Sequence, residues 1–135
     1  MPTELLHEDL TGKIRQTAYE VHRYFGNGFL EKVYENALAH RLRKAGLNVQ
    51  QQVPITVKDE DGTPVGEYCA DLLVEGFLVI VLKAAKAIIN EHLAQLMNYL
   101  KATGQELGLL VNFGSATFQF KRIVYSQPPG DATSG

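Results

Sequence analysis

The run Phe77–Leu82 is the feature of this sequence that most constrains the fold, because it is apolar at every position. A strand with one solvent-exposed face alternates apolar and polar residues, so a run without alternation predicts a strand covered on both faces. We interpret the segment Leu107–Phe113 in the same way. Strands of this kind need helices on both sides of their sheet, so the two runs predict an α/β domain.

Three other segments have apolar residues three and four positions apart, which predicts amphipathic helices. The first covers residues 8–25 and ends at the glycines that follow Phe25, the second covers 31–45, and the third covers 90–103. Gly46 follows the second segment, where a left-handed cap commonly ends a helix. Two helices therefore open the chain, and a third lies between the two apolar runs.

Residues 49–57 alternate with period two and are followed by a charged Asp-Gly turn, which is typical of a hairpin. The return strand covers 65–74, and a last strand covers 118–125. The order is thus two helices, three strands, a helix and two strands. A meander followed by a helical crossover predicts a mixed central sheet flanked by helices on both sides.

Composition limits the chain to one globular domain, since it has 135 residues, 45% of them hydrophobic, and a net charge of -2. We assign the domain to residues 1–126 and expect the Pro-, Gly- and Ser-rich tail 127–135 to be disordered. No apolar stretch approaches the ~18 residues of a membrane span, and the N-terminus does not resemble a signal peptide. The single Cys69 suggests a reducing, cytoplasmic setting. The charge balance lacks the basic footprint of a bulk nucleic-acid binder, so any such binding must be local.

Two charged residues lie in strongly apolar surroundings. Asp71 stands within Ala70–Val74, where an acid is costly unless it is paired, hydrogen-bonded or bound to a metal, and we weigh a functional and a structural role equally. Lys83 directly follows the apolar run Phe77–Leu82. It either extends its ammonium group to water, which is the commoner case, or points into a site.

Two further pairs share a helix face by their spacing. Glu31 and Tyr34 are three residues apart, and taken alone they favour a solvated acid and a core tyrosine. Gln95 and Tyr99 are four residues apart, with His92 one turn earlier. Such a lone histidine is more often a satisfied surface residue than a ligand.

Taken together, these residues resemble a known family. The segment Gly28–Tyr34 matches the pattern after which the GxxExxY proteins are named, which are members of the PD-(D/E)XK nuclease superfamily. The resemblance covers about residues 8–125, in the same order along the chain. Its other matching segments are Glu20–His22, Gly66–Val74, Gln95–Lys101 and Leu107–Phe113.

The resemblance implies a restriction-endonuclease-like fold and metal-assisted phosphodiester hydrolysis. In such a site acids hold Mg²⁺, which activates water and stabilises charge on the phosphate, and a lysine orients the water or the phosphate. Carried over to this sequence, Asp71 is the first metal acid and Glu31 an additional one. The implied catalytic residues are Lys83 of the (D/E)XK triplet, Gln95 and Tyr99 of a Gln-x-x-x-Tyr element, and Tyr34.

The sequence departs from the family at the centre of this site. The triplet acid stands two residues before the lysine, and here that position is Val81, which cannot ligate a metal. The nearest other acids, Glu75 and Glu91, do not keep the spacing. We therefore expect a degenerate site without a bound cofactor. A natural member that has drifted from catalysis and an engineered variant both remain open.

The segment after Lys83 is unusually apolar and is our candidate for a self-assembly surface. Ile88 and Ile89 are adjacent and cannot point the same way, so one of them should be exposed in the monomer. The alternative is a satellite cluster folded over the sheet edge. We thus weigh a self-assembling or binding scaffold, a homo-oligomer, against a Mg²⁺-dependent nuclease of DNA or RNA. The candidate interface residues are Phe77, Ala84, Ala85, Ala87, Ile88 and Ile89.

Overall fold

The computed structural model describes residues 7–126, so the tail 127–135, predicted to be disordered, lies outside the described residues. These described residues form three helices and five strands in the predicted order. The elements are α1 (Glu8–Phe25), α2 (Glu31–Lys44), β1 (Val49–Lys58), β2 (Pro64–Val74), β3 (Leu78–Lys83), α3 (Asn90–Thr103), β4 (Leu107–Asn112) and β5 (Gln119–Val124).

The helix ends follow from local sequence signals. Gly26, Gly46 and Gly104 have φ angles of 75°, 93° and 71°, and this left-handed region costs glycine little. The predicted boundaries of α1 and α3 match the observed ones. Within residues 7–126, no helix combines the length and the hydrophobicity that crossing a membrane requires.

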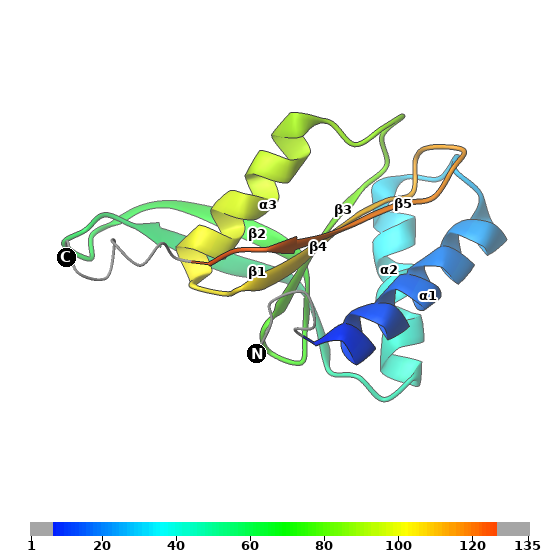
Figure 1. Ribbon diagram of the computed structural model, residues 1–135, viewed down its shortest axis with the longest axis horizontal. Coiled ribbons are helices and arrows are strands. Elements are labelled where there is room, and N and C mark those ends of the chain that lie inside the picture. Colours follow the sequence, from blue (N-terminus) through cyan, green and yellow to red (C-terminus); the bar gives the residue numbers. More distant parts are fainter. Residues whose placement is uncertain (1–6, 127–135) are drawn as a thin grey trace.

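The strands form one mixed sheet in the order β1-β2-β3-β4-β5. Only β3 and β4 run parallel, and α3 is the crossover that joins them. Figure 1 shows α3 on one side of the sheet and α1 and α2 on the other. The predicted α/β domain with a mixed, helix-flanked sheet is therefore confirmed.

The two central strands separate two hydrophobic clusters. Leu78–Leu82 of β3 and all of β4 are buried, which confirms the coverage on both faces that the apolar runs predict. Side chains under α1 and α2 form the first cluster, and side chains under α3 form the second. Gly108 lets α3 approach closely, since a Cβ atom there would lie 2.7 Å from Leu96 Cδ1.

The β1–β2 hairpin is longer than the part of it that pairs with β3. Its two strands pair from Val49 and Val74 outward, whereas β2 pairs with β3 only over Leu72–Val74. We call the outer part of the hairpin, residues 53–70, the arm, and Figure 1 shows it extending away from α1 and α2. Gln52, with a left-handed φ of 53°, lies where the arm begins. The sheet therefore forks directly beside Asp71.

Candidate functional site

Asp71 lies at the fork between β2 and β3. Leu72 pairs with Ile80, and continuing this antiparallel register by one residue places Asp71 opposite Val81. Beyond the fork the backbone N–H of Leu82 has lost its strand partner, and it donates a hydrogen bond to Asp71 Oδ2 at 2.7 Å. The carboxylate thus completes the backbone hydrogen bonding of β3, which explains how an acid is accommodated within apolar sequence.

Burial raises the pKa of Asp71, and the negative charge of Glu35 adds to this effect. The hydrogen bonds from Leu82 and Gln52 and the charge of Lys83 act in the opposite direction. The net increase indicates that the surroundings supply too little positive charge to offset the loss of water.

The position opposite Asp71 carries no carboxylate. Val81 is 2% exposed and belongs to the cluster beneath α3. Lys83, two residues further along β3, reaches the same side, where its Nζ donates to Gln95 Oε1 at 2.9 Å. An isopropyl group therefore lies between the acid and the lysine, and it offers no oxygen to a metal.

A relay of side chains joins Lys83 to α3. The Nε2 atom of Gln95 donates to the Tyr99 hydroxyl at 3.3 Å, so the two residues predicted to share a helix face do so, and Gln95 also accepts the hydrogen bond from the lysine. Burial raises the pKa of Tyr99, and the nearby charge of Asp71 raises it further. The Tyr99 ring packs edge-to-face against Tyr68 of the arm, with the centroids 5.3 Å apart.

Glu31 approaches this site from the first turn of α2. Burial raises its pKa, and the neighbouring charges of Asp71 and Glu35 raise it further, whereas the charge of Lys83 lowers it. The charges of the acid of β2 and the lysine of β3 therefore act on the acid of α2. That Glu31, Asp71 and Lys83 form one site stays a prediction.

Glu35 is a further acid beside the site that our sequence reasoning missed. It is 3% exposed, one turn after Glu31 on α2. Its Oε2 accepts hydrogen bonds from Lys32 Nζ at 3.0 Å and Gln51 Nε2 at 2.7 Å, and its Oε1 accepts one from Gln52 Nε2 at 2.7 Å. The spacing of four residues from Glu31 was the signal that could have revealed it.

Gln52 links the buried carboxyl group of Glu35 to the half-buried one of Asp71. Its Nε2 donates to Glu35 Oε1 and, at 3.3 Å, to Asp71 Oδ1. One amide thus bridges an acid of α2 and an acid of β2, from a residue whose left-handed backbone costs about 1–2 kcal/mol. In the sequence, Gln52 belonged only to the period-two segment 49–57 and carried no sign of this role.

Tyr34 does not join the site residues, although the resemblance implied a catalytic role. Its ring stacks on Phe113 with the centroids 4.7 Å apart. Its hydroxyl donates to the Gly26 carbonyl at 2.5 Å and accepts from the Phe29 backbone N–H at 3.1 Å. In the structure Tyr34 is a core residue that holds the loop between α1 and α2, which is the ordinary role for a tyrosine at this spacing.

These residues do not fit Mg²⁺ as they stand. The ion requires near-octahedral oxygen ligands, yet the Asp71 and Glu35 oxygens accept N–H groups of the protein. Within residues 7–126, no group of three or more His, Cys, Asp or Glu side chains is arranged to hold a metal ion.

The segment after Lys83 is partly anchored and partly exposed. The buried Asn112 side chain accepts from Ala85 N–H and donates to its carbonyl, and Gln119 accepts from Ile88 N–H. Ile88 packs on the cluster beneath α3, whereas Ile89 is 49% exposed. Of the other candidate interface residues, Ala84 and Ala87 are exposed, and Ala85 and Phe77 are half-buried.

Comparisons with known proteins concern the family and the fold. The profile described as the PD-(D/E)XK nuclease superfamily matches residues 8–123, and no curated protein matches. Among solved structures, the crystal structure of SSO0001 is similar, with a TM-score of 0.59 and 17% sequence identity over 96% of this chain. The chain spans 66% of the length of that protein, so the likeness concerns the fold.

Proposed function

This chain belongs to the PD-(D/E)XK nuclease superfamily, and we propose that it is a GxxExxY-type member that has lost metal-dependent hydrolysis and acts as a binding protein. Proteins of this superfamily typically depend on a divalent metal. In this proposal Val81 occupies the position of the missing metal-ligating acid. Asp71, Glu31, Lys83 and the Gln95–Tyr99 pair remain in the degenerate site, and the protein serves as a scaffold.

One observation carries the proposal: Val81, 2% exposed, stands opposite an Asp71 whose two carboxylate oxygens already accept hydrogen bonds within the protein. Losing a direct metal ligand costs more than losing one of its supporting residues, which is itself worth about 10- to 100-fold. The internal bonds also stabilise the arrangement without a metal. The fold can therefore persist after the reaction is lost.

A Mg²⁺-dependent nuclease is the second candidate, supported by the electrostatic influence of Lys83 on Glu31 and Asp71 and by the hydrogen bond from Lys83 to Gln95. Incubating the chain with labelled DNA and RNA in the presence of Mg²⁺ separates the two candidates. We expect no cleavage above that of buffer. Cleavage by the unaltered chain that disappears in Asp71→Ala would refute the proposal and favour the nuclease.

The proposal includes self-association as a homo-oligomer. The exposed side chains of Ala84, Ala87 and Ile89 support it, because they form an apolar edge after β3 whose backbone is held in place by Asn112. A fully buried isoleucine contributes about 1.5–3 kcal/mol, and symmetry repeats each contribution. Light scattering at micromolar concentration tests this part, and a monomer would exclude it.

A further inference from the structure

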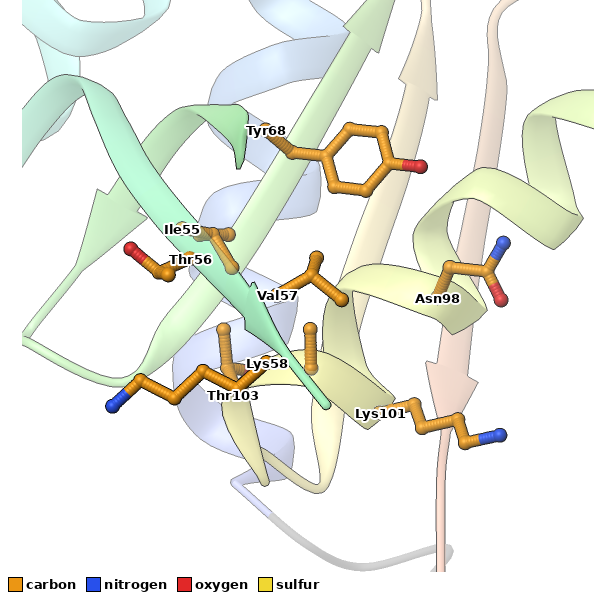
Figure 2. A pocket seen from close by; sticks show the side chains of 9 residues that line it. Ile55, Thr56, Val57, Lys58, Tyr68, Asn98, Lys101 and Thr103 are labelled. Atoms are coloured by element: carbon orange, nitrogen blue, oxygen red, sulfur yellow. The ribbon is translucent and has the colours of Figure 1, made fainter. Parts of the chain in front are cut away.

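A groove runs between the arm and α3, outside the set of acids. Its larger part has a volume of about 820 Å³ and is shown in Figure 2. A second cavity of about 410 Å³ adjoins it and shares Tyr68 and Asn98 as lining residues. The two together run beside α3 from Lys101 to Gln95, which holds Lys83. We call them the α3 groove.

The α3 groove combines an aromatic platform with one cationic end. Tyr68 is 43% exposed, and its contact with Tyr99 holds the ring edge-to-face. Figure 2 shows the Tyr68 ring at one end and Lys58 and Lys101 at the other, with their ammonium groups directed to opposite sides of the opening. Asn98 supplies an amide between them.

We propose that the α3 groove binds a short single strand of nucleic acid, with a base stacked on Tyr68 and phosphates near Lys58 and Lys101. This inference rests on the proposed binding function and names its ligand. Bases stack on aromatic side chains when they are unpaired, whereas a duplex covers their faces. From Lys101 to Gln95 the helix rises about 9 Å, room for about two or three nucleotides at ~3.4 Å or more each.

Charge favours this ligand over a peptide. No acid lines the larger cavity among the residues described, and its two lysines complement a polyanion. Glu91 lines the far end of the second cavity, next to His92. The strand should therefore enter at the lysine end and finish near Gln95.

Fluorescence anisotropy of the full chain with labelled oligonucleotides of about ten nucleotides tests the proposal. We expect oligo-dT and oligo-U to bind and a duplex of equal length to bind at least about tenfold more weakly. Tyr68→Ala should weaken single-strand binding about tenfold or more, and Tyr68→Phe should preserve it. Lys101→Ala should reduce the salt slope by about 0.7.

Tyr19→Ala is the matched control, because Tyr19 is also 43% exposed and also packs edge-to-face on an aromatic ring, that of Phe118, but it lies on α1. It should leave binding unchanged. Equal losses in Tyr19→Ala and Tyr68→Ala would overturn the proposal, as would a duplex preference or the absence of single-strand binding. Each of these results leaves the proposed loss of hydrolysis standing, because the cleavage assay tests that loss separately.

Discussion

Introducing an acid opposite Asp71 should make this protein depend on Mg²⁺ for its stability. In Val81→Glu the new carboxylate would stand next to Asp71 and on the same side as Lys83. Without a metal, the change removes a buried apolar side chain, worth about 1.5–3 kcal/mol, and buries a charge beside another acid. We therefore expect the free energy of unfolding to fall by about 2–5 kcal/mol in chelator.

Mg²⁺ should restore much of the lost free energy of unfolding. A ligand that binds only the native state at a concentration of about 100 times its Kd stabilises by about 2.7 kcal/mol. For a domain of this size, 1 kcal/mol corresponds to roughly 3–6 °C in Tm. Thermal unfolding of Val81→Glu should therefore show a rise of roughly 10 °C between chelator and saturating Mg²⁺, and calorimetry should show binding.

Val81→Gln is the matched control. Glutamine has nearly the same shape as glutamate, so this variant loses the same packing as Val81→Glu, but its side chain is a neutral amide. It should be destabilised and should gain nothing from Mg²⁺. If Val81→Glu unfolds completely in chelator, circular dichroism during Mg²⁺ titration still reports whether the metal restores the fold. The reasoning is refuted if the unaltered chain gains as much from Mg²⁺ as Val81→Glu, or if Val81→Glu and Val81→Gln respond alike.

Three further changes test other parts of the structure. Burial raises the pKa of Glu31 above its ordinary value of 4.5, so the native state holds this proton more tightly than the unfolded chain. The stability that this protonation contributes is fully present at pH values below the ordinary pKa of 4.5. It is lost as the pH rises through the higher pKa of the native state. Glu31→Gln should therefore raise the Tm at about pH 7 but not at about pH 3.5, and an equal change at both would contradict this assignment. Tyr34→Phe leaves the Gly26 carbonyl and the Phe29 N–H without their partner, so urea unfolding should show a loss of about 1–3 kcal/mol, and an unchanged midpoint would argue against the role of the hydroxyl. Ile89→Asp should yield smaller, folded particles in light scattering if the exposed side chain forms a subunit interface, whereas unchanged particle size would remove it from that interface.

The sequence by itself determined most of the fold. The apolar runs around Ile80 and Leu109 predicted central strands covered on both faces, because any polar position on such strands would have faced a helix. Helix spacing and terminal glycines gave α1 and α3 their exact boundaries, since these signals act over a few residues of the same chain. That Gln95 and Tyr99 share one face of α3 was also predictable, because residues four apart lie on the same side of a helix.

Only the tertiary structure decided what surrounds Asp71. The bridge that Gln52 makes between Asp71 and Glu35 joins residues from three elements, and no local spacing specifies such contacts. The spacing of Tyr34 favoured a core position, but the ring on which it stacks, that of Phe113, lies far along the chain and no local pattern specifies it. Pairing between β2 and β3 ends at the fork where the arm leaves the sheet. The packing of whole elements sets the position of this fork. The fork in turn decides which backbone N–H groups need a side-chain partner.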